Sequence, residues 1–162
     1  MLKVINGGSE PTRATKYSAM VDLYARENVV IGAGETKIVP LGVKIDEDAI
    51  RNTCLEDWEH FGCFMSSHYL ELHPRSSLRA KGLIIGVGVI DLDYPDEIGL
   101  IVHNPIMEIW TVGIGDKCLL RGKYTINKGD KIAQCTLKEH KGYLLGIESD
   151  TERTGGFGSS DK

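Results

Sequence analysis

The chain has 162 residues, of which 41% are hydrophobic, and its formal net charge is −4 at pH 7. This length and composition are typical of a single domain with a substantial core. Proteins that capture a nucleic-acid backbone usually carry clustered Lys and Arg, so the acidic balance indicates no nucleic-acid partner. Neither a signal peptide nor an apolar stretch of about 18 residues, which a membrane span requires, is present. We therefore expect a soluble, cytoplasmic protein with no membrane partner.

Short runs rich in β-forming residues recur along most of the chain, separated by turn residues. Such spacing, with Gly, Asn and Pro between the runs, predicts an all-β sandwich or barrel and not alternating βαβ units. The runs lie at 21–25, 36–45, 68–72, 82–90, 98–104, 117–120, 123–126, 132–137 and 142–147.

In the segment that follows the acidic residues 46–48, the apolar residues recur with a different spacing. Apolar side chains recur there at intervals of three or four residues, at Ile50, Cys54, Trp58, Phe61 and Met65. This pattern predicts an amphipathic helix with a negatively charged first turn.

Four cysteines, at positions 54, 63, 118 and 135, are scattered along the chain. A domain of this size folds without disulfides, so we expect free thiols. Cys54, His60, Cys63 and His68 are residue types that ligate zinc, but their spacing matches no zinc pattern. A place in the core of the helical segment is the favoured interpretation.

The segment HPRSSLRAKG at 73–82 places Arg75 directly before Ser76 and Ser77. We expect a very short helix there, capped by one of the serines and ended by Gly82. A guanidinium, hydroxyls and free backbone N–H groups together can hold phosphate oxygens. The alternative is a surface turn in which serine only caps the helix.

The next segment, GLIIGVGVIDLDY at 82–94, is an apolar run that ends in two carboxylates and a tyrosine. Glycines in a strand allow a flat ligand to approach the backbone closely. In an extended strand Asp91 and Asp93 point to one face and Leu92 to the other. The alternative is a solvated acidic turn after a buried strand.

Two further segments carry polar groups suited to phosphate. Gln134 interrupts the apolar strand in NKGDKIAQCTL at 127–137, although a surface glutamine is the ordinary alternative. The final residues 149–162 combine an aromatic ring, an arginine and serines among glycines. Such a strap can stack on a base and bind phosphate, whereas a disordered tail is the alternative.

In this order, the segments resemble the conserved motifs of the trimeric dUTPase family. SAMVDLYA at 18–25, PRSSL at 74–78, GVIDLDY at 88–94, GDKIAQ at 129–134 and RTGGFGSS at 153–160 resemble its first to fifth motifs. The resemblance implies an all-β, jelly-roll-like β barrel over residues 1–148. It also implies insertions at about 47–67 and 105–124, the first of them helical, and a mobile C-terminal arm over 149–162.

The resemblance further implies a homotrimer with active sites at subunit contacts, each closed by the arm of a neighbouring subunit. The implied reaction is Mg²⁺-dependent hydrolysis of dUTP to dUMP and pyrophosphate. By similarity, Asp91 activates the attacking water, Tyr94 packs against the sugar, and Asp22 supports Mg²⁺ through water. The other implied substrate-binding residues are Arg75, Ser76, Ser77, Gly88, Ile90, Gln134, Arg153, Phe157, Gly158, Ser159 and Ser160.

The chain departs from the family pattern at Met20, Ile85, Asp96 and Lys131, the last of which replaces a customary arginine. Two alternatives stay open. A dCTP deaminase-type enzyme shares the barrel and an R-S-S-L segment, but it needs a glutamate where this chain has Ile101. A regulatory protein of the same fold would use the insertions to bind a protein partner.

Overall fold

A computed structural model describes the whole chain except residues 6, 55–57, 107–121, 148–150, 152–154 and 157–162, and except the side chains of 58–60. The strands are β1 (Leu2–Val4), β2 (Val21–Tyr24), β3 (Val29–Ile31), β4 (Thr36–Pro40), β5 (Val43–Ile45), β6 (His68–Pro74), β7 (Gly88–Asp91), β8 (Gly99–His103), β9 (Tyr124–Ile126) and β10 (Lys131–Glu139). The helices are α1 (Glu47–Cys54), α2 (Trp58–Ser67), α3 (Ser76–Ala80) and the 3-10 helix η1 (Gly142–Leu145).

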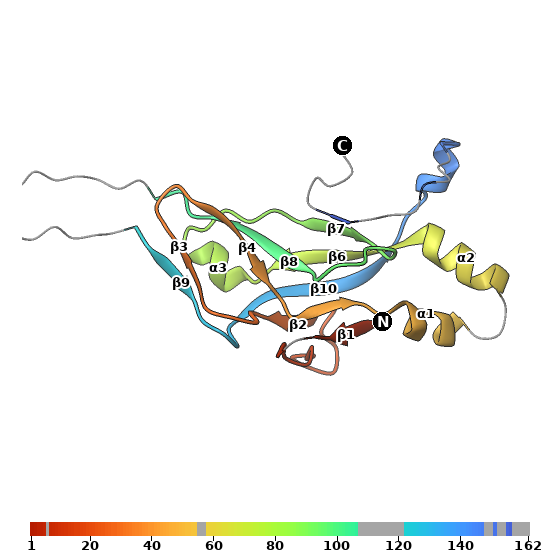
Figure 1. Ribbon diagram of the computed structural model, residues 1–162, viewed down its shortest axis with the longest axis horizontal. Helices are drawn as coiled ribbons and strands as arrows, with labels where there is room; N and C mark the ends of the chain where they lie inside the picture. Colours follow the sequence, from red (N-terminus) through yellow and green to blue (C-terminus); the bar gives the residue numbers. More distant parts are fainter. Residues whose placement is uncertain (6, 55–57, 107–121, 148–150, 152–154, 157–162) are drawn as a thin grey trace, which may run out of the picture.

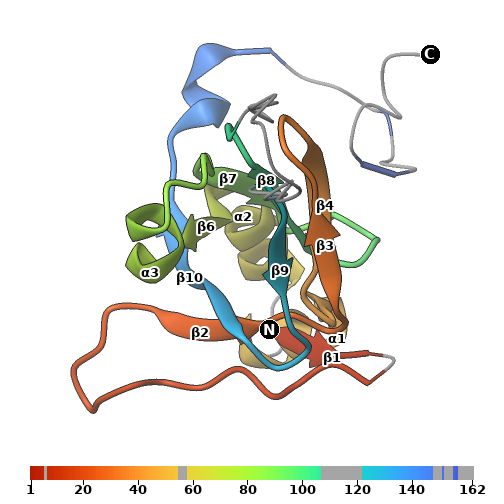
Figure 2. The ribbon, with the colours of Figure 1, turned by 90° about the vertical axis from the view of Figure 1, so that its left-hand side faces the viewer.

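The largest sheet has four antiparallel strands in the order β2-β10-β6-β7. Three antiparallel pairs, β1-β5, β3-β9 and β4-β8, complete the strand pairing of the described residues. The helices α1 and α2 lie together at one end of the long axis (Figure 1). Figure 2 shows β10 running between β2 and β6. The predicted all-β class is therefore confirmed.

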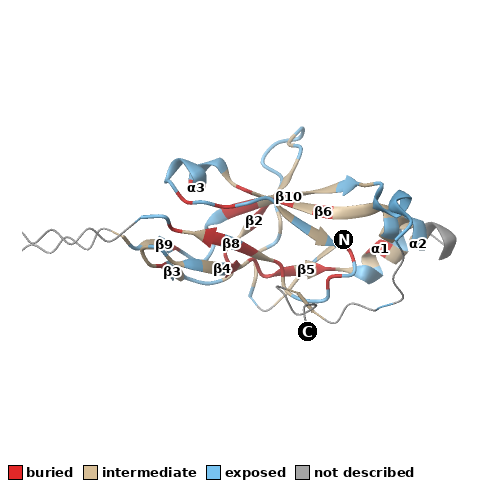
Figure 3. Ribbon diagram, turned by 90° about the horizontal axis from the view of Figure 1, so that it is seen from above, coloured by how far each residue is buried: buried red, intermediate tan, exposed pale blue. Residues whose placement is uncertain are grey.

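The core lies between the four-stranded sheet and the smaller pairs, where the buried residues of both gather (Figure 3). On β6, Leu70 and Leu72 are buried, whereas Glu71 and His73 face outward and are only partly covered. This alternation is the period of two that a strand with one buried face requires. The same strand thus presents an apolar face to the core and a polar face to the outside.

The run predicted as one strand at 36–45 is broken at Gly42, which separates β4 from β5. Gly42 has a φ of +66°, in the left-handed region that favours glycine. The backbone of Gly8 passes so close that a Cβ at either glycine would overlap the other residue. The carboxylate of Glu97 accepts a hydrogen bond from the Gly42 N–H at 2.7 Å and fixes the bend.

The helical segment is confirmed, but as two helices and not one. Ile50 on α1 is fully buried, and Phe61 and Met65 on α2 pack partly buried against the core. The acidic first turn of α1 holds Glu47, whose carboxylate pairs with Arg51 one turn later. The apolar period and the acidic start therefore predict this region correctly.

The predicted serine cap of α3 is wrong. Arg75 occupies the N-cap position with an extended backbone and makes no side-chain cap hydrogen bond. Ser76 and Ser77 are the first residues inside the helix, and both are exposed. Gly82 follows the helix with a φ of +84°, so the predicted glycine at its end is confirmed.

Other strand predictions need correction. The run at 82–90 forms a strand only from Gly88 onward, preceded by one isolated bridge between Ile84 and His103. The run at 142–147 contains the 3-10 helix η1 instead of a strand. The prediction at 117–120 lies outside the described residues. The sequence interpretation missed β1 and β3, each only three residues long.

The described cysteines Cys54, Cys63 and Cys135 are free. Burial raises the pKa of the Cys135 thiol to about 12, so this thiol stays protonated at neutral pH. His68 stacks on Phe64 with ring centroids 4.2 Å apart. Within the described part of the chain, no three His, Cys, Asp or Glu side chains gather to hold a metal ion. None of the described helices is long and apolar enough to cross a membrane.

Two neighbouring residues on β3 differ in burial, so substitutions at them test which side chains belong to the core. Ile31 is fully buried and Val30 is 45% exposed. Ile31→Ala should lower the free energy of unfolding by about 2–5 kcal/mol, because it leaves a cavity in the core. Val30→Ala should cost less than about 1 kcal/mol. Denaturant titration of both variants checks this, and equal losses would show that the core boundary is misplaced.

Candidate active site

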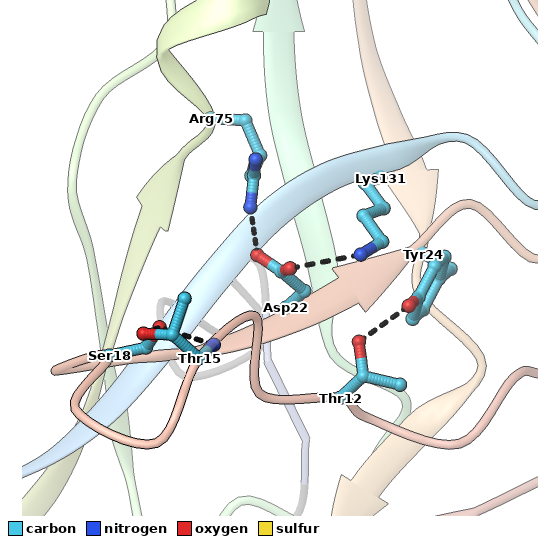
Figure 4. Close-up of polar contacts among 7 residues, drawn as sticks. All are labelled: Thr12, Thr15, Ser18, Asp22, Tyr24, Arg75 and Lys131. Carbon is cyan, nitrogen blue, oxygen red and sulfur yellow. Dashed lines mark hydrogen bonds and ion pairs between the residues drawn. The ribbon is translucent and has the colours of Figure 1, made fainter.

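A buried carboxylate with two cationic partners lies at one end of the four-stranded sheet. Asp22, on β2, has a side chain that is only 2% exposed. One of its oxygens accepts a hydrogen bond from the guanidinium of Arg75, and the other accepts one from Nζ of Lys131 at 3.3 Å. Figure 4 shows the two cations reaching Asp22 from different sides. We call Asp22, Arg75 and Lys131 the cation cluster.

The order of the strands explains why these residues meet. Gln134 is the Cα partner of Asp22 on one side and of His73 on the other, so the three share one row of the sheet. Arg75 follows β6 directly, and Lys131 begins β10. The predicted residues Asp22, Arg75 and Gln134 are therefore brought together, with Ser76 and Ser77 exposed at the start of α3.

Electrostatics leave the cation cluster positively charged, because one carboxylate faces two cations. The hydrogen bond to Asp22 is the largest cause that raises the pKa of Lys131, and the neighbouring Tyr24 adds to it. Lys131 therefore stays protonated across the physiological range. In the sequence Lys131 stands out only as a departure from the family pattern, so the predicted site does not include it.

An apolar pocket of about 390 Å³ lies elsewhere on the same chain. Residues 86–90, residues 99–101 at the start of β8, and Leu72, Tyr94 and Ile98 line it. A Cβ at Gly88 would meet Cβ of Leu72 on β6 at 3.4 Å, an ordinary van der Waals contact, so the pairing of β7 with β6 does not itself require glycine here. The predicted residues Gly88, Ile90 and Tyr94 are thus brought together around one cavity.

The acidic end of β7 follows Ile90, the last residue of that strand in the pocket lining. Asp91 and Asp93 are exposed and Leu92 is 3% exposed, but β7 ends at Asp91 and residues 92–93 form a turn closed by the Tyr94 N–H and the Asp91 carbonyl. The exposed acidic turn after the strand, and not a continued extended strand, is therefore what the structure has. Tyr94 is 8% exposed. Gly156 of the C-terminal segment lies against its ring, with no room for a Cβ. The other arm residues of the prediction, Arg153, Phe157, Gly158, Ser159 and Ser160, lie outside the described residues.

Within one chain, Asp91 is far from the cation cluster. The register between β6 and β7 pairs Asp91 with Tyr69. Arg75 follows six residues after Tyr69 along the same extended strand, which corresponds to a separation of about 20 Å. The structure therefore divides the predicted site into two half-sites, one around the cation cluster and one around the apolar pocket.

A hydrogen-bonded row on the outer face of β6 runs between the two half-sites, and the sequence interpretation missed it. Glu71 accepts a hydrogen bond from the Tyr69 hydroxyl at 2.9 Å and lies 2.7 Å from Nε2 of His73. The contact with His73, followed by the one with Tyr69, lowers the pKa of the Glu71 carboxyl. The alternation in HYLELHP was the available signal, because every second residue is polar.

Comparisons with known proteins point to the same family. The family described as dUTPase matches residues 61–118. The deoxyuridine 5'-triphosphate nucleotidohydrolase of Variola virus is 30% identical over 169 residues, which cover 98% of this chain and 90% of that protein. The enzyme of the same name from Rabbitpox virus (strain Utrecht) is 31% identical over 133 residues, covering 82% of this chain and 69% of that protein.

Solved structures share the fold. The dUTPase from phage phi11 of S. aureus matches with a TM-score of 0.65 at 20% identity, covering 98% of this chain and 97% of that one. The dUTPase from Streptococcus mutans matches with a TM-score of 0.59 at 23% identity, covering 85% and 94%. The predicted dUTPase-like fold is confirmed by these neighbours. With a viral relative aligned over almost its whole length and a matching family description, this chain belongs to the dUTPase family.

Proposed function

We propose that this protein hydrolyses dUTP to dUMP and pyrophosphate, the activity for which its poxvirus relatives are named. The observation that carries the proposal is the apolar pocket lined by residues of β7 and β8 and by Tyr94, in which Ile90, the residue before Asp91, takes part. Its volume of about 390 Å³ falls in the usual range for small-ligand sites.

The pocket suits a pyrimidine without a charged group. Gly86 and Val87 precede the ladder of β7, so their backbone groups are not committed to strand pairing and can meet the edge of a uracil. None of the described residues that line the pocket is Asp or Glu. Ile101 lies in this lining where a dCTP deaminase would need its glutamate, which argues against deamination.

Asp91 is proposed as the general base. Its carboxylate stands exposed at the end of β7, directly before the buried Leu92. In this role it takes a proton from a water that attacks the α-phosphorus, while the bond from that phosphorus to the bridging oxygen breaks. Pyrophosphate leaves, and dUMP stays in the pocket. Such a base typically contributes about 10²- to 10⁴-fold.

The triphosphate needs the other half-site, which we propose comes from a second copy. Arg75, Ser76, Ser77 and Gln134 would then bind phosphate oxygens opposite Asp91. Exposed apolar side chains support association between copies: Tyr143, Leu144, Leu145 and Ile147 are 55–85% exposed. A homotrimer closed by the arm residues Arg153, Phe157, Gly158, Ser159 and Ser160 is the form that the family resemblance implies.

The residues of this protein fit a Mg²⁺ ion that binds together with the nucleotide phosphates, and not one coordinated by protein side chains alone. Both oxygens of Asp22 already accept bonds from cations, and the described residues contain no cluster of three potential ligands. Mg²⁺ commonly binds substrate phosphates and water with few protein ligands. When bound, it would neutralise charge on the phosphates. The outer-shell contact of Asp22 through water stays a proposal.

Substrate specificity is the direct test of this function. With Mg²⁺ present, pyrophosphate release from dUTP should far exceed release from dCTP, dTTP and UTP, because in the proposed function Tyr94 packs against the deoxyribose and the backbone of 86–88 meets the uracil edge. Rapid ammonia release from dCTP would favour the deaminase instead. Absence of turnover with every nucleotide would favour the regulatory protein, for which the insertions at 47–67 and 105–124 are the predicted partner surface.

The general base gives a second prediction. Asp91→Asn should lower kcat for dUTP by about 10²-fold or more, because the amide cannot take the proton from water. Binding of the non-hydrolysable analogue dUpNHpp should change little. Asp93→Asn is the matched control, since this neighbouring exposed carboxylate has no assigned role, and it should retain most of kcat. Unchanged turnover in Asp91→Asn would contradict the mechanism.

A further inference from the structure

We infer that nucleotide binding is coupled to uptake of a proton by His73, whose imidazole lies beside the bound phosphates and is held there by Glu71. The inference rests on the proposed function and deepens it, because it adds a phosphate-binding residue and makes the affinity depend on pH. Glu71 acts through His73 and is therefore a positioning residue.

His73 lies next to the groups proposed to bind phosphate. It is the Cα partner of Gln134 on β10, and Gln134 is in turn the partner of Asp22 on β2. Side chains at directly opposite positions of an antiparallel pair stand about 5 Å apart at Cβ. Arg75 follows His73 by two residues with its backbone still extended, so both side chains lie on the same face. Phosphates held by Gln134 and Arg75 would therefore lie beside the His73 ring.

The contacts of Glu71 determine which nitrogen of His73 is available. Nε2 of His73 lies 2.7 Å from one Glu71 oxygen, and the Tyr69 hydroxyl donates to the other. The contact with His73, followed by the one with Tyr69, lowers the pKa of the Glu71 carboxyl, so this group is ionised at neutral pH. An ionised carboxylate only accepts hydrogen bonds, so Nε2 carries a proton. Nδ1 has no hydrogen-bond partner among the described residues and is the atom that can gain a second proton.

The charges around His73 explain why the second proton comes with the ligand. Histidine is the side chain whose charge changes near neutral pH. The Glu71 carboxylate favours the imidazolium, whereas the nearby cations oppose it. A polyphosphate adds negative charge at this position, so its binding shifts the balance toward the imidazolium. The ionisable groups on this face are Tyr69, Glu71 and Arg75 along β6 and just after it, Lys131 and Lys138 of β10, Asp22 and Tyr24 of β2, and Asp91 of β7 opposite Tyr69.

Proton counting tests the inference. Calorimetric titration with dUpNHpp and Mg²⁺ near about pH 7.5, in buffers of different ionisation enthalpy, gives the number of protons taken up on binding. The wild type should take up more protons than His73→Gln, by up to about one proton, because ionisation of the ligand itself is common to both. Glu71→Gln should also lower the uptake, since the imidazolium loses its anionic partner.

The affinity of the same variants gives a second measurement. His73→Gln should weaken dUpNHpp binding about tenfold near about pH 6, the usual scale for loss of a charge-assisted hydrogen bond. Near about pH 9 the ratio to the wild type should approach one, because a neutral imidazole has no charge to lose. His73→Lys keeps a positive charge over this whole range, so it should retain the affinity without the extra proton uptake.

The control is His103→Gln, because His103 lies on the β4-β8 pair and hydrogen-bonds to Thr36. It should leave both proton uptake and affinity as in the wild type. Equal uptake in the wild type and His73→Gln overturns the inference, and so does an affinity loss that is the same at acidic and alkaline pH, which would indicate a structural role. If His73→Gln does not fold, His73→Asn is read by the same criteria. A wild type that neither binds dUpNHpp nor turns over dUTP contradicts the proposed function itself, whereas equal uptake with normal turnover contradicts this inference alone.

Discussion

The antiparallel ladder that joins β10, β6 and β7 determines how this protein can build a nucleotide site. β6 connects both half-sites. Arg75 follows the last residue of β6, and Asp91 on β7 pairs with Tyr69 near the start of β6. An extended strand cannot shorten, so the two functional side chains are held about 20 Å apart in any one copy. The proposed active site therefore requires a contact between copies of the chain.

The positive charge at the site comes from a few neighbouring side chains and not from the net charge of the protein. The chain is acidic, with a net charge of −4, yet the cation cluster gathers two positive groups around one buried carboxylate. Asp22 pairs with both cations, whose side chains remain 33% and 45% exposed. In the proposed function this local charge binds a polyanionic substrate without a basic surface, which would also attract nucleic acid.

The sequence predicted those features whose signals are local. Strand periodicity located β2, β6, β8 and β10, and the apolar period with an acidic start located the helices α1 and α2. The contact of Lys131 with Asp22 depends on strand order, since 109 positions separate the two residues. The run at 142–147 has the composition of a strand, but residues Gly142–Leu145 form the 3-10 helix η1 and pair with no strand of the described residues. Likewise, the cap of α3 is mispredicted because Arg75 takes that position without a side-chain bond, which leaves the serines exposed inside the helix.

Mixing of two inactive variants tests the central claim most directly. Asp91→Asn and Arg75→Ala each damage a different half-site, so each variant alone should be nearly inactive. If the two half-sites come from different copies, assemblies refolded from an equal mixture contain sites with both residues intact, and about a quarter of the wild-type activity should return. If mixed assemblies form and no activity returns, Asp91 and Arg75 must act within one chain, which contradicts an active site assembled between copies.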